Sequence, residues 1–360
     1  MKKTKFFEIH QNLGAKIVEF AGYLMPIQYS SIIAEHKAVR NSVGVFDVSH
    51  MGEVFVSGKN ALEFVQYITV NDAAKLEVGK VQYSAMCYED GGIVDDLLVY
   101  KISDEQFMFV INASNIEKDF SWMNKNNSFG VTLENDSDDY SLLAIQGPNS
   151  KEILQKICDK NLDIEYYSFI SAKIGGYEML VSRTGYTGEL GYEIYFNGDE
   201  KIAADVWNKI FDSGKNYNIQ PVGLGARDSL RLEMGFCLYG NDIDKTTNPL
   251  EAGLGWITKL NKKNFIAKES LKKIKSEGLK RKLVALSSDE KCFPRHGHEL
   301  SVDGKIAGHI TSGTVSPVLN KAIALAYLDA NYFYSSSKVN FLIRGKEIRA
   351  EIVKLPFLKK

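Results

Sequence analysis

The chain has 360 residues, of which 44% are hydrophobic and 25% are charged, and its formal net charge is −1. This composition excludes a disordered protein and is sufficient for two or three packed units. The balanced charge gives no overall attraction to nucleic acid, so any electrostatic partner has to meet a local patch.

Neither the cysteines nor the hydropathy pattern indicates a secreted or membrane protein. The four cysteines lack CxxC spacing, which argues against a zinc ribbon and against a disulfide framework. The N-terminal stretch MKKTKFFEIHQNLGAK has no continuous apolar core, and no later window reaches the roughly 18 apolar residues that span a bilayer. We therefore expect a cytoplasmic protein with no membrane partner.

The first part of the chain alternates between helical and extended patterns. In chain order the patterns predict a helix over 30–42, a strand-like stretch over 43–58, a helix over 60–68, a hairpin over 81–102 that turns at 89–92, and a strand over 106–112. Ser114 and Glu117 have the spacing of a capping box, which predicts that a helix begins there. The order is typical of an α+β fold of the ferredoxin-like kind.

A comparable unit follows, and the pattern then changes to short strands. The second unit has a strand over 140–147, a helix that Pro148 opens, a hairpin over 183–196, and helices through about residue 275. From residue 280 onward, short strands separated by Gly, Ser and Asn turns predict a small β-barrel or sandwich. We place the domain boundary near Gly278, which gives domains of 1–277 and 278–360. The first domain is expected to contain two interleaved subdomains, about 1–50 with 140–277, and 51–139.

Two adjacent carboxylates, Asp95 and Asp96, lie in the middle of the apolar strand GGIVDDLLVY. Side chains alternate along a strand, so the two point to opposite faces, both otherwise apolar. An unpaired ionised carboxylate in such a place costs several kcal/mol. Each is either a structural acceptor of backbone N–H groups or part of a functional site, where unusual buried charges gather, and the functional interpretation is stronger for Asp96.

Two further segments carry polar residues that a pure scaffold does not need. Arg227 lies in the first turn of a predicted helix, where a cation opposes the helix dipole; either Asp228 neutralises it or its guanidinium points into a cavity. In SRTGYTGELGYEIYF the glycines permit a close backbone approach, and Tyr186 and Glu193 offer a hydroxyl and a carboxylate. From its spacing alone, Glu193 could equally be a solvent-facing strand residue.

Two other features have an ordinary explanation. Cys292, His296 and His298 lack a second ligand pair and are interpreted as a loop, so no metal site is predicted. The lysine-rich stretch 259–282 is expected to be a solvated helix face, with a docking surface for an acidic partner as the alternative. In that alternative, Lys262, Lys263, Lys272 and Lys273 contribute to the docking surface.

Motifs spread over the whole chain resemble those of one family. The aminomethyltransferases, or T-proteins, of the glycine cleavage system are similar in the stretches FDVSHMGE, GGIVDDLLVY, INASNIEKDF, SRTGYTGELGYE, GLGARDSLRLE, LYGNDID, NPLEAGLGW and VKLPF. The resemblance implies α+β subdomains around a central channel, with a C-terminal β-barrel. One departure is Leu190, where the family often has an acid, and this puts the local turn in doubt.

The resemblance also implies an activity and a set of site residues. The family transfers the methylene carbon of an aminomethyl group on lipoylated H-protein to tetrahydrofolate, which is a substrate, and needs no metal. Asp96 would be the key carboxylate near the reactive folate nitrogens, and the folate contacts would be Tyr186, Glu193, Arg227, Met51, Tyr83, Asn112 and Trp256. The partner would be the H-protein, bound transiently, and a monomer is favoured.

Chemistry agrees with this assignment. A pterin presents adjacent N–H donors that a carboxylate such as Glu193 can accept together, and its flat face suits aromatic walls. Positive charge develops as ammonia leaves, and a fixed anion at Asp96 would stabilise it. The alternatives are a related folate-dependent demethylase and a non-catalytic folate-binding accessory protein. The accessory branch carries a cysteine in the stretch that matches GYTGE, and this chain has none there.

Overall fold

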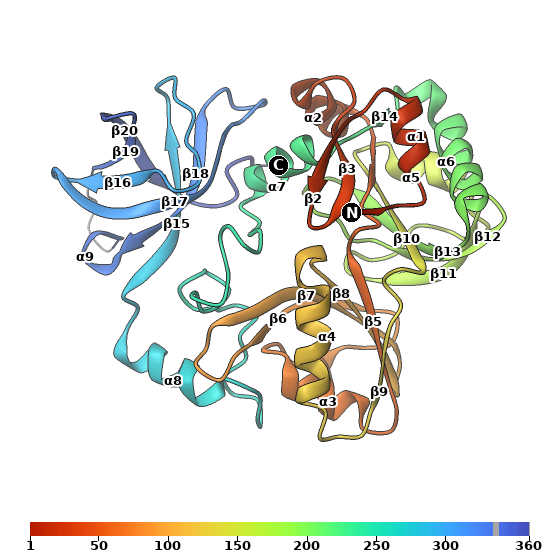
Figure 1. The fold of residues 1–360 in the computed structure, drawn as a ribbon, viewed down its shortest axis with the longest axis horizontal. Coiled ribbons are helices and arrows are strands. Elements are labelled where there is room, and N and C mark those ends of the chain that lie inside the picture. The colour runs from red at the N-terminus through yellow and green to blue at the C-terminus, as the bar shows by residue number, and fades with distance from the viewer. Residues whose placement is uncertain (334–337, 360) are drawn as a thin grey trace. The chain divides into compact units, whose positions relative to one another are not determined.

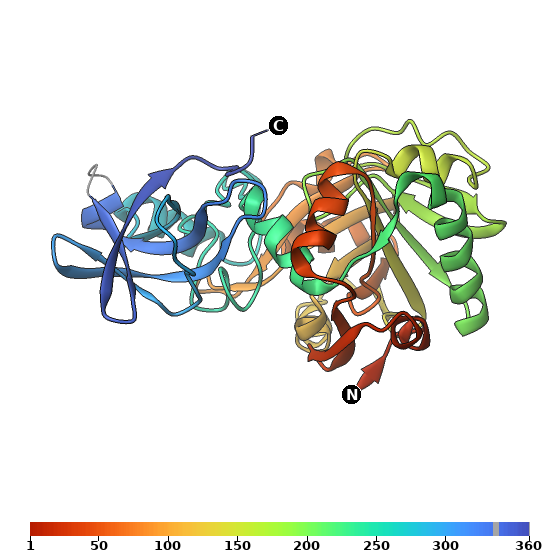
Figure 2. The ribbon, with the colours of Figure 1, turned by 90° about the horizontal axis from the view of Figure 1, so that it is seen from above.

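The computed structural model describes residues 1–333 and 338–359, traced in Figures 1 and 2. The chain divides into two compact units, each discontinuous in sequence. The first comprises Met1–Phe64, Ala73–Gln82 and Leu97–Asp228, and the second comprises Val65–Asp72, Tyr83–Asp96 and Ser229–Lys360. No helix among the described residues is both long enough and apolar enough to cross a membrane.

One sheet has the strand order β6-β7-β8-β5-β9. Its strands and the helices between them are β5 (Gly52–Ser57), α3 (Ala61–Ile68), β6 (Val81–Cys87), β7 (Ile93–Ser103), β8 (Gln106–Ile111), α4 (Ile116–Lys125) and β9 (Thr132–Asn135). The pairings of β8 with β5 and β7, and of β5 with β9, are antiparallel. With β6 set aside as an added edge strand, this is the ferredoxin-like order, as predicted.

The second sheet has the order β11-β12-β13-β10-β4-β14, which resembles the first in β12-β13-β10 but has β11 as an extra edge strand and β4 between β10 and β14. Its elements are β4 (Gly44–Asp47), β10 (Tyr140–Gln146), α5 (Ser150–Gln155), β11 (Phe169–Ile174), β12 (Tyr177–Ser182), β13 (Gly191–Asn197), α6 (Glu200–Gly214) and β14 (Gln220–Pro221). Although β4 comes before the whole first sheet in sequence, it pairs with β10. This pairing interleaves the start of the chain with its later part.

The stretch 43–58, expected to be continuously extended, is two strands of different sheets. The chain turns between β4 and β5, where the Met51 N–H donates to the Val48 carbonyl (3.0 Å) and the Ser49 N–H donates to the Asp47 carboxylate (3.0 Å). The remaining N-terminal elements are β1 (Lys2–Lys3), α1 (Phe7–Asn12), β2 (Lys16–Phe20), β3 (Tyr23–Gln28) and α2 (Ile32–Asn41).

The alternation along β13 decides which residues enter the core. Tyr192, Ile194 and Phe196 join a core that includes Val206 and Trp207 of α6. Figure 1 shows α6 running beside this sheet. Glu193 and Tyr195 therefore lie on the opposite face of the strand, as the sequence predicted.

Two details of the helices differ from the prediction. The capping box was wrong, because a 3₁₀ turn over Ala113–Asn115 leads into α4 and no side chain caps the helix. The Asn115 N–H is already bonded to the Asn112 carbonyl (2.9 Å). Helices were also expected through about residue 275, but the described chain forms turns and bends between α7 (Leu224–Met234) and α8 (Lys268–Glu277).

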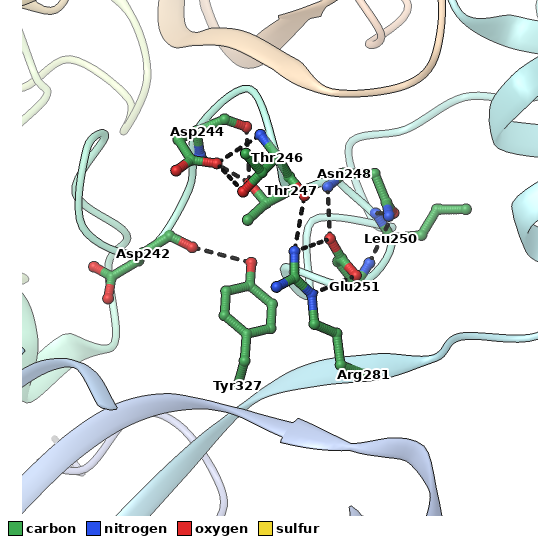
Figure 3. Close-up of polar contacts among 9 residues, drawn as sticks. All are labelled: Asp242, Asp244, Thr246, Thr247, Asn248, Leu250, Glu251, Arg281 and Tyr327. Atoms are coloured by element: carbon green, nitrogen blue, oxygen red, sulfur yellow. Dashed lines mark hydrogen bonds and ion pairs between the residues drawn. The ribbon is translucent and has the colours of Figure 1, made fainter. Parts of the chain in front are cut away.

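This irregular segment, which we call the 235–267 loop, is held by its own polar contacts rather than by helical hydrogen bonds. Gly235 has φ +73°, which ends α7 in a conformation that few other residues adopt. Figure 3 shows the Asp244 carboxylate accepting from both the N–H and the hydroxyl of Thr246 (each 2.7 Å), and the Glu251 carboxylate bonding Asn248 and Arg281.

The C-terminal strands form a closed barrel in the order β15-β18-β17-β16-β19-β20, as predicted. They are β15 (Arg281–Ser288), β16 (Glu299–Val302), β17 (Lys305–Val315), β18 (Ala322–Asp329), β19 (Val339–Ile343) and β20 (Lys346–Val353), with the short α9 (Ala330–Phe333) after β18. Along β18, Ala322, Ala324, Ala326 and Leu328 enter the barrel core. The second unit combines this barrel with Ser229–Glu277 and two earlier segments, so a boundary near Gly278 stays a prediction.

Candidate active site

The predicted site residues belong to two groups in different units. The first unit contains Met51, Asn112, Tyr186, Glu193 and Arg227, and the second contains Tyr83, Asp96 and Trp256.

The glycine-rich loop between β12 and β13 closes around a buried glutamine. The Gln146 side chain donates to the Thr184 carbonyl (3.2 Å) and accepts from the Thr187 hydroxyl (2.9 Å). A Cβ on Gly185 or on Gly191 would overlap the amide group of Gln146. The two glycines are therefore required by close approach, and they leave space for the amide that fixes the loop.

Leu190 takes part in this loop through its backbone. Its carbonyl accepts from the Gly147 N–H (2.7 Å) and from the Ser150 hydroxyl (3.2 Å). Neither contact depends on the side chain at position 190, so an apolar residue there leaves these bonds of the loop in place.

Glu193 lies within a cluster of hydroxyl groups, on the face of β13 opposite the side chains that pack against α6. Its carboxylate accepts from the Thr184 hydroxyl and is also hydrogen-bonded by Tyr195. The Tyr195 and Tyr100 hydroxyls are 2.9 Å apart, and the Tyr100 hydroxyl donates to Ser182 Oγ (3.1 Å). The alternative that Glu193 faces solvent is therefore wrong, because Thr184 in the β12–β13 loop and Tyr195 on the same strand supply its partners.

Burial raises the pKa of Glu193, while the Thr184 hydrogen bond, the Arg227 charge and Tyr195 oppose the rise. The Arg227 guanidinium carbon lies 4.5 Å from the centre of the Tyr186 ring, a cation–π geometry. These three predicted residues line one small pocket, together with Phe46, Val48, Ala144, Gln146 and Thr187. Arg227 thus faces a cavity, which favours the second of its two interpretations.

A buried carboxylate fixes the chain just before Arg227. Glu35, in α2, accepts from the backbone N–H groups of Tyr29 (2.7 Å), Ser30 (2.8 Å) and Gly223 (2.8 Å). Because α7 begins at the next residue, these bonds set the position from which the Arg227 side chain extends.

His50 is a buried, neutral neighbour of this group. Burial and the Arg227 charge lower the pKa of His50 to about 3, although Asp47 opposes the change. Its Nδ1 atom has no hydrogen-bond partner among the described residues, and its ring contacts Phe20 edge-on with centroids 5.4 Å apart. Asp47 itself forms a buried pair with His10 Nε2 (2.9 Å).

The second group is built around Asp96 on β7. The Tyr83 hydroxyl donates to Asp96 Oδ2 (2.8 Å) across the β6–β7 hairpin. The Tyr83 ring lies 6.1 Å from that of Trp256, which is 64% exposed. Asp95 on the opposite face is fully buried, whereas Asp96 is half-buried. A half-buried carboxylate beside an aromatic pair has the access that a reacting group needs.

Met51 and Asn112 are half-buried residues at the ends of turns. Met51 closes the turn after β4, and Asn112 follows β8 and accepts the Asn115 N–H. Their folate contacts stay predictions.

The loop interpretation of the cysteine and histidine cluster agrees with the structure. Cys292 is buried, and His296 is exposed with its Nδ1 2.8 Å from the Thr311 carbonyl. Among residues 1–333 and 338–359, no group of three or more His, Cys, Asp or Glu side chains is arranged to hold a metal ion.

Lys262 does not belong to the solvated lysine face. It is 8% exposed, and its ammonium donates to the carbonyls of Thr69 (2.6 Å) and Asn71 (2.7 Å) and to the Gln66 side chain (3.3 Å). Burial lowers its pKa to about 7. The expected docking role for Lys262 is therefore wrong, while Lys263, Lys272 and Lys273 are exposed.

Several residues that shape the site were missed by sequence reasoning. These are Gln146, Thr184, Tyr195, Tyr100 and Glu35. A usable signal existed for Gln146, a polar residue that ends an otherwise apolar strand, and for Tyr195, which shares a strand face with Glu193. The partners of Tyr100 are 82 to 95 residues away in sequence, and the Gly223 partner of Glu35 is 188 residues away, beyond any local pattern.

Family models match both parts of the chain. The GCVT N-terminal domain matches residues 6–262, and the glycine cleavage T-protein C-terminal barrel domain matches residues 281–359. A protein of Halothermothrix orenii named aminomethyltransferase is 51% identical over 99% of this chain and its own full length. One of Flavobacterium psychrophilum with the same name is 53% identical over the full length of both.

A solved structure agrees with these relatives. The glycine cleavage system aminomethyltransferase T from Bartonella henselae is 32% identical and superposes with a TM-score of 0.92, covering 99% of this chain and 98% of that one. With matches of this extent in sequence and in fold, the chain belongs to the glycine cleavage T-protein family of aminomethyltransferases.

Proposed function

We propose that this enzyme transfers the methylene carbon of an aminomethyl group, carried on the lipoyl arm of H-protein, to tetrahydrofolate. The carbon–nitrogen bond to ammonia and the carbon–sulfur bond to the lipoyl group break, and two bonds to folate nitrogens form. The two hydrogens that leave the folate nitrogens go to ammonia and to the lipoyl thiol. The products are 5,10-methylenetetrahydrofolate, ammonia and dihydrolipoyl H-protein.

The observation that carries the assignment of roles is the chemistry of the two carboxylates. Glu193 has an acceptor group in a pocket with Tyr186 and Arg227, which suits paired N–H donors beside a flat ring. Asp96 accepts from the Tyr83 hydroxyl at 2.8 Å and keeps half-buried access. We assign pterin recognition to the Glu193 group and charge stabilisation to Asp96.

Asp96 acts when ammonia leaves. Positive charge then develops on the transferred carbon and its nitrogen, and a carboxylate fixed in a low-dielectric site stabilises it without reorganising solvent. The Tyr83 hydroxyl orients the carboxylate, and the exposed Trp256 ring beside Tyr83 offers a flat apolar surface to the substrate. Met51 and Asn112 complete the predicted folate contacts.

The test combines Asp96→Asn with an assay of aminomethyl-loaded H-protein and tetrahydrofolate. We expect kcat to fall about a hundredfold or more. Tetrahydrofolate affinity should change little, because the proposed work of the carboxylate is in the transition state. Formation of methylenetetrahydrofolate and release of ammonia are both measured.

Asp95→Asn is the matched control on the same strand. Asp95 is fully buried, so its loss should lower the unfolding temperature while the folded fraction keeps its turnover. Undiminished turnover in Asp96→Asn would remove Asp96 from the mechanism.

A further inference from the structure

The barrel and the 235–267 loop connect to the strand that carries Asp96. In the second unit, Ile93 opens β7 three residues before Asp96, and both of its backbone groups bond to the loop. Its N–H donates to the carbonyls of Asp244 (3.1 Å) and Thr247 (2.9 Å), and its carbonyl accepts from the Tyr239 hydroxyl (3.2 Å). Both backbone hydrogen-bonding groups of Ile93, the first residue of β7, are therefore bonded to the loop.

The chain leaves little clearance at this contact. A Cβ on Gly92 would overlap the Lys245 carbonyl, so the loop backbone lies directly against the turn that leads into β7. Displacement of the loop would consequently be transmitted to the start of the strand rather than absorbed by a gap.

The loop in turn is fixed to the barrel by a buried ion pair. Asp242 is fully buried, and its carboxylate accepts from Arg231 Nη1 (2.7 Å), from the Leu238 N–H (2.9 Å) and from the Thr311 hydroxyl of β17 (2.5 Å). Arg231 Nη2 also donates to the Ser312 hydroxyl (2.8 Å). Both charges are thus saturated by partners from α7, the loop and β17.

Two more bonds, both visible in Figure 3, attach the loop to the neighbouring strands. The Tyr327 hydroxyl of β18 donates to the Asp242 carbonyl (3.0 Å), and Arg281 of β15 donates to the Thr246 carbonyl (2.8 Å) and to Glu251. Three barrel strands therefore bind one side of the loop, and Ile93 binds the other.

We propose that Asp242 and Tyr239 are positioning residues for the reaction, which act by fixing the backbone at Ile93 and hence the direction of the Asp96 carboxylate. The inference rests on the proposed role of Asp96. In this proposal the C-terminal barrel contributes to the reaction by supporting Asp96, a carboxylate that lies outside the barrel sequence. A misplacement of about 1 Å at a reacting group can cost on the order of a hundredfold in rate, so a fixed support has a measurable effect.

The experiment compares Tyr239→Phe, Asp242→Asn and Tyr327→Phe in the full chain, with Tyr177→Phe as the matched control. Tyr177, the half-buried first residue of β12, donates a hydrogen bond to Asp205 (2.8 Å) and belongs to the other unit. We expect Tyr239→Phe to lower kcat about fivefold and Asp242→Asn about tenfold or more, with the KM for tetrahydrofolate within about twofold of the parent. Tyr177→Phe should leave both constants unchanged.

Backbone hydrogen exchange separates positioning from general loss of structure. In Tyr239→Phe, the amides of residues 91–96 should exchange about tenfold faster while the barrel strands keep their protection. If Asp242→Asn fails to fold because Arg231 is left unpaired, Tyr239→Phe and Tyr327→Phe decide the question.

Unchanged kcat in folded Tyr239→Phe and Tyr327→Phe overturns the proposal, as does a fall in kcat that comes with faster exchange throughout the second unit. The role of Asp96 is judged separately. Full activity of Asp96→Asn would remove Asp96 from the mechanism and with it the premise of this inference, whereas an inactive Asp96→Asn with normal positioning variants would refute only this inference.

Discussion

The two units differ in whether buried polar atoms are left without a partner among the described residues, although the first unit also contains saturated carboxylates such as Glu35. In the second unit, the buried charges Asp242 and Lys262 are each surrounded by three partners at hydrogen-bond distance. In the first unit, His50 Nδ1 and Glu53 Oε1 are buried without a hydrogen-bond partner among the described residues, and burial raises the pKa of Glu193.

The difference indicates different purposes. A saturated buried ion fixes the chain around it, because moving any partner leaves a charge uncompensated. A buried carboxyl with a raised pKa, such as Glu193 in the pocket, has a protonation state that a ligand can change. We interpret the pocket of the first unit as the part of the site that recognises the substrate. The network of buried hydrogen bonds in the second unit is interpreted as the part that fixes the positions of the residues around it.

The largest expected effect is on stability in the second unit. Lys262→Met should lower the free energy of unfolding by about 3 kcal/mol, because the Thr69 and Asn71 carbonyls lose their donor inside the protein. The exposed neighbour provides the control, since Lys263→Met should change stability by less than about 0.5 kcal/mol. Denaturant unfolding measures the free energy of unfolding of both variants. Equal losses would contradict the distinction between a buried, hydrogen-bonded lysine and a solvated one.

Next in size is the ligand affinity of the first unit. Glu193→Ala should weaken tetrahydrofolate binding by about 2 kcal/mol, roughly thirtyfold, while kcat at saturation falls far less than in Asp96→Asn. Calorimetric titration with tetrahydrofolate measures the affinity. A variant that binds normally but turns over slowly would mean that the two carboxylates had been assigned the wrong roles.

The pH dependence of the same binding tests the raised pKa of Glu193. Protonation removes an acceptor, so affinity should fall as the pH falls through that raised pKa. The Arg227 charge opposes the rise, and Arg227→Met should therefore move the acidic limb to higher pH. An acidic limb that stays in place in Arg227→Met would exclude Glu193 as the titrating group.

A last expected effect, on the pH dependence of stability, concerns His50. Its folded pKa of about 3 lies below the unfolded value of about 6.5, so the unfolded chain binds a proton first and stability falls as the pH drops between these values. His50→Gln should reduce this slope by up to about 1.4 kcal/mol per pH unit. The same substitution at the exposed His296 controls for loss of an imidazole, and equal slopes in the two variants would contradict the assignment.

The local sequence pattern was sufficient to predict most helices and strands and to indicate the chemistry of single residues. The period-two pattern of β13 placed Glu193 opposite the core, and the apolar strand around Asp95 and Asp96 marked two carboxylates that needed an explanation. The whole-chain resemblance supplied the family and the roles that the residues alone left open. At α4 the predicted helix start was confirmed and only its capping box was wrong, whereas prediction failed in the 235–267 loop, where neighbours in space decide.

The sequence by itself thus determined an α+β protein with a terminal β-barrel, because side-chain period and turn residues are local properties. Only the tertiary structure decided that β4 pairs with β10, that Lys262 is buried while Lys263 is exposed, and that Ile93 is held from the 235–267 loop. The physical reason is that a hydrogen bond between residues far apart in sequence leaves no periodic trace in either segment. Burial of a charge depends on partners that only the folded chain brings within reach.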